Sequence, residues 1–138
     1  MPLRCSLAGG GTDLFHFYKD NVGQTISLTI EKYAYCVIER YGGDGCVVTC
    51  PNVNQEYKVA DIQDFESLGR SEGNLILTTL KELGLKSGYK VTVWIEAPIG
   101  SGLAGSTALV TAVIAAVDRL FGHYRTKTQL LPSLKSSL

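Results

Sequence analysis

The sequence predicts an α+β fold, because its patterns change from strand-like to helix-like along the chain. Apolar and polar side chains alternate over residues 24–41, which is typical of half-buried strands, and short strand-like segments follow at 46–50 and 56–60. Two later segments carry apolar residues at helical spacing, with one more alternating segment between them. The order of strands, helix, strand, loop and helix favours α+β over a regular βαβ repeat. With 138 residues, 45% of them hydrophobic and 19% charged, the chain suits one globular domain.

The predicted strands are separated by turns rich in glycine, proline and asparagine. Alternation within residues 24–41 indicates either two strands or one long bent strand. Two turns follow, one at residues 42–45 and one at residues 51–54. In chain order, the strands are expected at residues 5–8, 24–41, 46–50, 56–60 and 88–96.

Two helices are expected, and the second is the more apolar. The first covers residues 73–83, with Gly84 placed to end it. The second, residues 106–121, is apolar over so much of its circumference that it needs cover on several sides. Little of the chain remains to supply that cover. We therefore expect exposed apolar surface between Val110 and Phe121, through which copies of the chain form a homo-oligomer.

Charge and cysteine content argue against several classes of function. Thirteen basic residues balance thirteen acidic ones without long runs, so no footprint for nucleic acid or an anionic membrane is visible. The four cysteines form no CxxC pair, which argues against a zinc site and favours buried free thiols; they are Cys5, Cys36, Cys46 and Cys50. No signal peptide is visible at the start, so a cytoplasmic location is expected.

An uncharged run at residues 97–117 is, at 21 residues, long enough to span a bilayer. Its first part contains Pro98 and a Gly/Ser cluster, which cannot continue a helix through hydrocarbon. We therefore expect a helix buried in protein.

A glycine-rich turn leads directly into the last helix. Gly100, Gly102 and Gly105 free the backbone to turn successive N–H groups toward one point, and the start of the helix adds unpaired N–H groups there. A phosphate is the expected guest. The alternative is a tight strand-to-helix connection that binds nothing.

Two standard phosphate motifs fit this turn poorly. A dinucleotide GxGxxG fingerprint requires a second strand ending in an acidic residue, but Asp118 lies inside the helix. A Walker motif requires a lysine where Ser106 stands.

A second glycine cluster lies near the amino terminus. Gly9, Gly10 and Gly11 would let the backbone approach a ligand closely. Asp13 offers a carboxylate to hydroxyl groups, and Arg4 supplies a fixed charge. The alternative is a flexible turn whose aspartate caps a short helix.

Together, the two clusters resemble motifs of the GHMP kinases, the family of galactokinase, homoserine, mevalonate and phosphomevalonate kinases. PIGSGLAGSTA, from Pro98 to Ala108, resembles their phosphate-binding motif. PLRCSLAGGGTDL and the later TIEKY resemble the branch of heptose-7-phosphate kinases and related sugar kinases. The resemblance implies the fold of the family's amino-terminal domain, which is like ribosomal protein S5 domain 2, with an antiparallel or mixed sheet and helices on one face.

The resemblance also implies an activity and a set of site residues. Such kinases use ATP and Mg²⁺ to phosphorylate a hydroxyl of a small metabolite, here a sugar or sugar phosphate. Residues implied to bind the nucleotide are Pro98, Gly100, Ser101, Gly102, Leu103, Ala104, Gly105, Ser106 and Thr107, with Ser106 also contacting Mg²⁺. Residues implied to bind the substrate are Gly9, Gly10, Gly11, Thr12, Asp13 and Arg4, with Arg4 also near the reacting centre. Gly10 and Gly11 replace a Glu-His pair of galactokinases, which argues against galactose.

The sequence departs from the family pattern in two ways. Ala104-Gly105 stands where the family usually has Gly-Ser, so one hydroxyl is missing. The family's further acidic Mg²⁺ ligand, catalytic aspartate and carboxy-terminal domain are not found. We therefore expect an amino-terminal domain at residues 1–121 and an atypical tail at 122–138, with the general base absent and activity of these residues alone uncertain. The alternative is a non-catalytic nucleotide-binding or interaction module.

Overall fold

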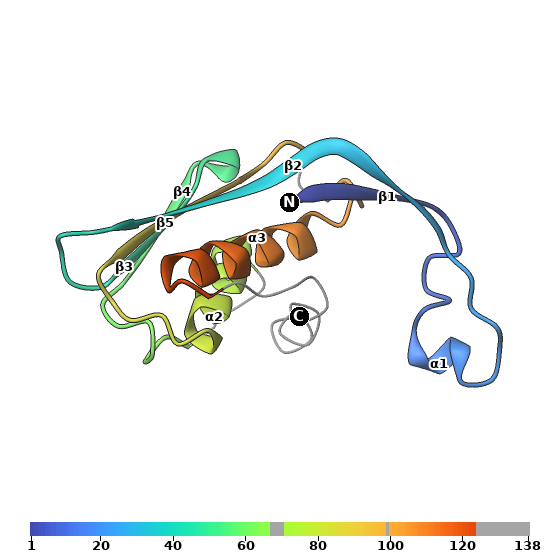
Figure 1. The fold of residues 1–138 in the computed structure, drawn as a ribbon, viewed down its shortest axis with the longest axis horizontal. Helices are drawn as coiled ribbons and strands as arrows, with labels where there is room; N and C mark the ends of the chain where they lie inside the picture. Colours follow the sequence, from blue (N-terminus) through green and yellow to red (C-terminus); the bar gives the residue numbers. More distant parts are fainter. Residues whose placement is uncertain (67–70, 99, 124–138) are drawn as a thin grey trace.

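A five-stranded sheet with the order β1-β2-β5-β3-β4 organises the protein (Figure 1). The computed structural model describes residues 1–66, 71–98 and 100–123, and the structural statements below concern those residues. The strands are β1 (Pro2–Ala8), β2 (Ile26–Arg40), β3 (Cys46–Cys50), β4 (Gln55–Val59) and β5 (Tyr89–Ile95). The helices are α1 (Phe15–Tyr18), η1 (Pro51–Val53), α2 (Glu72–Glu82) and α3 (Gly105–Leu120). The α+β prediction is confirmed, and each predicted element is present within a few residues of its expected bounds.

The long strand β2 joins the two parts of the sheet. Its first half pairs antiparallel with β1, and its second half pairs antiparallel with β5. Residues 26–40 therefore form one strand, which settles the choice that the alternation pattern left open. The pair β3·β5 is parallel and β3·β4 is antiparallel, so the sheet is mixed.

Both longer helices lie on the same side of the sheet, as Figure 1 shows. The core forms where β3 and β5 face them, and it includes Val48, Val91, Val93, Leu80 and Leu109. Helix α2 ends as predicted: Gly84 takes a left-handed conformation (φ 70°), and the N–H groups of Gly84 and Leu85 return to the carbonyls of Lys81 and Leu80.

The prediction of a widely exposed apolar face on the last helix is wrong. Val110, Ile114 and Val117 are buried, and only Leu120 and Phe121 at its end are exposed, at 37% and 47%. Helix α3 contacts β1, β2, β5 and α2, and residue counting did not foresee these contacts. Among the described residues, no helix is both long and apolar enough to cross a membrane. Beyond residue 123, the expected tail lies outside the described residues.

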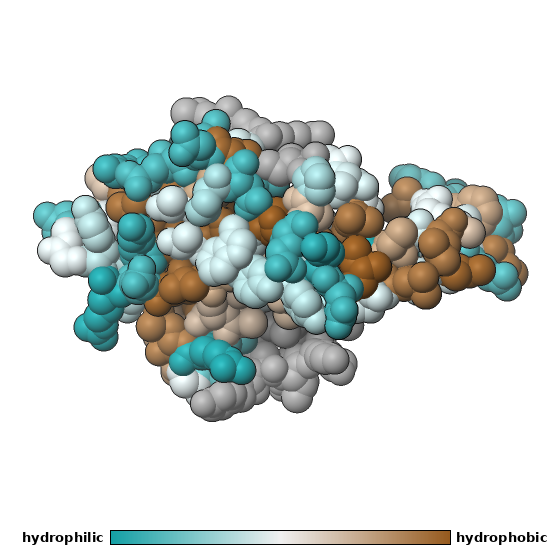
Figure 2. All heavy atoms as spheres, turned by 90° about the horizontal axis from the view of Figure 1, so that it is seen from above, coloured by the Kyte–Doolittle hydropathy of each residue, from teal (hydrophilic) through white to brown (hydrophobic). Residues whose placement is uncertain are grey.

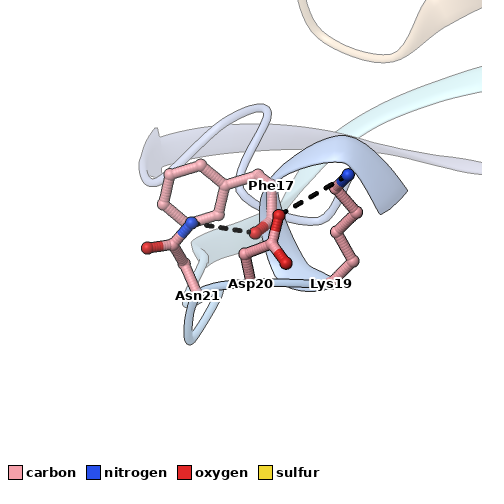
Figure 3. A network of polar contacts seen from close by, with 4 residues as sticks. All are labelled: Phe17, Lys19, Asp20 and Asn21. Carbon is pink, nitrogen blue, oxygen red and sulfur yellow. Dashed lines mark hydrogen bonds and ion pairs between the residues drawn. The ribbon is translucent and has the colours of Figure 1, made fainter.

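The exposed apolar surface lies instead on an arm formed by the outer parts of β1 and β2 with α1 at its tip (Figure 1). Figure 2 shows this arm as a separate lobe with hydrophobic side chains on its surface. Its exposed apolar residues include Leu7, Leu14, Phe15, Phe17, Tyr18, Val22, Ile26 and Leu28. At the tip, Asn21 donates a hydrogen bond to the carbonyl of Phe17, and Lys19 pairs with Asp20 (Figure 3).

Candidate functional site

A pocket of about 310 Å³ lies where the glycine-rich loop leaves β5 and enters α3. It is lined by Glu72, Ile95, Pro98, Gly100, Ser101, Gly102, Gly105 and Ser106. The ends of three elements meet here: the last residue of β5, the first residue of α2 and the first turn of α3. Because β3 and β5 run parallel, their carboxyl ends share this edge of the sheet, the position where sheets of this kind commonly bind ligands.

The edge is held in place by Asn52, in the turn that follows β3. Its side chain bonds both backbone groups of Ile95, at 2.8 Å each. The start of the loop is therefore fixed before the glycines begin.

The backbone of the loop takes conformations that favour glycine. Gly100 and Gly102 have φ values of 76° and 72°, and a Cβ at either would meet nothing within 4 Å. Their requirement for glycine comes from conformation rather than crowding. Ala104 also takes a left-handed conformation, with φ 57° and ψ 35°, at the N-cap of α3. Its alanine carries a strain that glycine would not.

The first turn of α3 presents donors to this pocket. The first helical hydrogen bond is donated by Ala108 to the carbonyl of Ala104, and no side chain caps the helix. The N–H groups of Gly105, Ser106 and Thr107 therefore have no backbone partner earlier in the helix, as at any helix start. A Cβ at Gly105 would lie 2.8 Å from Cδ1 of Ile95, so the end of that side chain would have to move to make room for it.

Glu72 is the pocket residue that reading the sequence missed. It begins α2, after the N-cap Ser71 whose hydroxyl accepts from the N–H of Asn74 at 3.2 Å. Burial raises the pKa of the Glu72 carboxyl above its ordinary value. Burial, and secondarily the Glu72 charge, raises the pKa of the Cys50 thiol to about 11. The sequence shows an acidic residue at the start of a predicted helix. It does not show that this residue lies next to a loop some thirty residues later in the chain.

The amino-terminal glycine cluster has a structural part and an open part. Gly9 has φ 77°, and a Cβ there would overlap the carbonyl oxygen of Gln24, so the two backbones of the arm lie in close contact. The Thr12 hydroxyl lies 2.7 Å from the carbonyl oxygen of Gly9 and 2.9 Å from that of Gln24. Gly10 and Gly11 face open space. The Asp13 side chain is exposed, and no hydrogen bond or ion pair to it is found in the described part of the chain.

The structure joins the two predicted motifs at one point. The N–H of Arg4 donates to the carbonyl of Leu103 at 3.3 Å, which ties β1 to the loop. Neither Arg4 nor Asp13 lines the pocket. The pocket gathers six of the predicted nucleotide-binding residues, but Leu103, Ala104 and Thr107 are not among its lining residues; the Thr107 carbonyl accepts from the Thr111 hydroxyl at 2.7 Å.

The side chains of the pocket suit Mg²⁺ only if bound phosphates supply most of its ligands. Among the described residues there is no group of three or more His, Cys, Asp or Glu side chains that could hold a metal ion. Mg²⁺ in proteins is usually held by one or two carboxylates together with substrate phosphates, rather than by a protein cage. One carboxylate, at Glu72, and one hydroxyl, at Ser106, are consistent with that manner of binding.

Comparison with known proteins relates the chain to one kinase family. Residues 74–136 match the family model described as the GHMP kinases N terminal domain. The D-glycero-alpha-D-manno-heptose 7-phosphate kinase of Campylobacter jejuni is 30% identical over 120 residues, which cover 83% of this chain and 35% of that protein. The galactokinase of Thermotoga maritima is 27% identical over 130 residues, covering 94% and 35% respectively. The chain thus spans about a third of the length of these curated relatives.

Solved structures show the same fold. A D-glycero-D-manno-heptose 1-phosphate kinase from Bacteroides thetaiotaomicron superposes with a TM-score of 0.82 at 24% identity, over 99% of this chain and 45% of that one. The mevalonate kinase of Methanococcus jannaschii gives a TM-score of 0.81 at 17% identity, with 99% and 44% covered. At these identities, the likeness establishes the fold.

Proposed function

Because this chain is a relative of the GHMP kinases and has the fold of their amino-terminal domain, we propose that it contributes the nucleotide site of an ATP-dependent kinase. The reaction would transfer a phosphoryl group to a hydroxyl of a sugar or sugar phosphate. The observation that carries this proposal is the pocket at the glycine-rich loop, where two helix starts meet the end of β5. We propose this activity for the whole protein, since the part of each curated relative that matches this chain is 35% of that relative's length.

The loop suits a triphosphate through its backbone rather than through a lysine. Phosphoryl transfer depends mainly on positioning and on neutralising charge. Gly100 and Gly102 leave open space where a side chain would stand, and the N–H groups at the start of α3 can donate to phosphate oxygens. Ser106 and Glu72 would hold Mg²⁺ together with the phosphates. When bound, the ion would neutralise phosphate charge.

The substrate side of the proposal rests on Arg4 and Asp13. The backbone N–H of Arg4 donates a hydrogen bond to the carbonyl of Leu103 in the glycine-rich loop. The Arg4 side chain therefore leaves the backbone next to the proposed nucleotide site. Asp13 is exposed, and no hydrogen bond or ion pair joins it to another described residue, so its carboxylate can accept hydrogen bonds from sugar hydroxyls. A heptose phosphate is the substrate class we propose, because the curated relative from Campylobacter jejuni is named as a heptose 7-phosphate kinase. We also propose that residues 1–121 form the amino-terminal domain and that residues 122–138 form an atypical tail.

Calorimetric titration tests both the nucleotide site and the substrate site. We expect Mg-ATP to bind wild-type protein, Ser106→Ala to weaken that binding, and Asp13→Ala to leave it unchanged while weakening the binding of a heptose phosphate. No detectable Mg-ATP binding, with Ser106→Ala indistinguishable from wild type, would contradict the nucleotide site. Parallel loss of both ligands in a folded Asp13→Ala protein would contradict the assignment of Asp13.

A second candidate is a non-catalytic nucleotide-binding or interaction module that self-associates. The apolar surface of the arm favours it, since Phe15 and Leu14 are 62% and 61% exposed. Sedimentation velocity over a range of concentrations tests it with Phe15→Asp as the variant. A dimer that Phe15→Asp abolishes would support this candidate, and a monomer at all concentrations would contradict it.

A further inference from the structure

The described lining of the glycine-loop pocket carries a negative side chain. Among the lining residues that the structure describes, Glu72 is the one ionisable side chain, and none is a lysine, arginine or histidine. A triphosphate in this pocket would therefore meet a carboxylate without a compensating basic side chain in the described lining. Backbone donors from the loop and helix provide only partial positive charge.

The surroundings of Glu72 strengthen its effect on a bound anion. The residue is neither fully exposed nor paired in a salt bridge of the described chain, whose ion pairs are Lys19 with Asp20 and Lys58 with Glu56. Burial raises the pKa of its carboxyl, and its charge is felt by the buried Cys50 thiol. A carboxylate withdrawn from bulk water interacts more strongly with a nearby charge than an exposed one does.

We infer that Glu72 is a specificity-determining residue, which makes this pocket select a nucleoside triphosphate that carries a divalent cation over the same triphosphate without metal. The inference rests on the proposed function. The repulsion between the carboxylate and a metal-free triphosphate lowers its affinity. A Mg²⁺ ion removes two units of negative charge from the nucleotide and offers the carboxylate a hard cation to face, directly or through its water. The Glu72 charge thereby disfavours the metal-free triphosphate and favours the Mg²⁺-bound one.

The test compares the dissociation constants of ATP in EDTA and in excess Mg²⁺ for wild type and Glu72→Gln, measured by calorimetry. We expect wild type to prefer the metal-bound form and Glu72→Gln to lose about fivefold to tenfold of that preference, because metal-free ATP binds more tightly and Mg-ATP more weakly; tenfold corresponds to about 1.4 kcal/mol. The matched control is Glu82→Gln, which removes an exposed carboxylate from the other end of α2. Its preference should equal that of wild type.

Wild-type protein alone gives a second measurement, which does not depend on the variant folding. In EDTA, affinity should fall from ADP to ATP as phosphate charge is added, and in Mg²⁺ it should not fall. An unchanged metal preference in a folded Glu72→Gln protein, or equal ADP and ATP affinities in EDTA, would overturn the inference while leaving the nucleotide site intact. Failure of wild type to bind any nucleotide would contradict the proposed function itself, and the inference with it.

Discussion

The side-chain amide of Asn52 pairs with both backbone groups of Ile95: its Nδ2 donates to the Ile95 carbonyl and its Oδ1 accepts from the Ile95 N–H, each at 2.8 Å. The registered pairs between β3 and β5 end at Thr49 and Thr92. Beyond this point the backbone after β3 turns away from β5. The Asn52 side chain takes the place of that backbone as the hydrogen-bonding partner of β5. This contact fixes the end of β5 from which the glycine-rich loop departs.

Replacing Asn52 with alanine should lower the free energy of unfolding by about 1 kcal/mol, because the part-buried N–H and carbonyl of Ile95 lose their side-chain partner. It should also weaken Mg-ATP binding, since the loop loses its anchor. Urea unfolding measures the first effect. Asn21→Ala is the control: within the described part of the chain, its exposed amide bonds to Phe17 alone (Figure 3), so stability should change little. Equal effects of the two substitutions would contradict the anchoring role.

Two adjacent glycines should differ sharply in their tolerance of alanine. Gly9 has a φ of 77°, and Gly9→Ala places a Cβ against the Gln24 carbonyl. We expect this substitution to lower the free energy of unfolding by about 1 to 3 kcal/mol. Gly10→Ala meets open space and should change stability by less than about 0.5 kcal/mol. The midpoints of urea unfolding decide between them. If Gly9→Ala were tolerated, the close contact between the two backbones of the arm would be wrong.

Glycine at position 104 should stabilise the protein, although glycine usually weakens a helix. Ala104 has φ 57° at the N-cap of α3, so Ala104→Gly removes left-handed strain and should raise the free energy of unfolding by roughly 0.5 to 1 kcal/mol. The same change also restores the glycine that the family motif usually carries. Ala108→Gly, inside the helix, should instead lower stability by about 1 kcal/mol. A destabilised Ala104→Gly protein would argue against the left-handed conformation.

Three cysteine thiols should be protected from alkylation in the folded protein. Burial raises the pKa of Cys36 to about 12 and that of Cys46 and Cys50 to about 11, from 9.0. Brief iodoacetamide labelling at pH 8, followed by peptide mass mapping, should leave them unmodified until urea is added. Rapid labelling of Cys46 without urea would contradict its burial.

The same shifts set a direction for stability in alkali. Between pH 9 and about 11 to 12, the unfolded chain releases thiol protons that the folded chain keeps. The folded state then binds more protons, so these groups stabilise it below pH 9 and lose that contribution as the pH rises through this window. Urea unfolding at pH 8 and pH 10 should show a decrease that a Cys46→Ala variant reduces.

The elements were predictable from the sequence because their signals are local. Alternation located β2 and β5, and Gly84 marked the end of α2. Contacts between distant segments were not predictable: Glu72 and Asn52 reach the loop only because β3 and β5 run parallel and α2 starts at their shared edge. The burial of α3 was missed for the same reason, since its contacts include three strands and a helix that are distant in the sequence.

The glycine clusters show how far a motif can be interpreted. At Gly100 and Gly102, the positive φ and open space agree with a backbone that faces a ligand. At Gly9, the same residue type serves a contact within the arm instead. Residue type and spacing cannot separate these two uses, because both require a backbone without a Cβ.

The most direct test of the nucleotide site is an NMR titration of ¹⁵N-labelled protein with Mg-ADP, which follows the backbone amides. The account predicts saturable shifts that are largest at Gly102, Gly105 and Ser106, with a smaller change at Glu72. The residues Arg40, Tyr41 and Ser87, which line a separate pocket, should not respond. Shifts confined to that second pocket, or no saturable shift in the glycine-rich loop, would contradict the account.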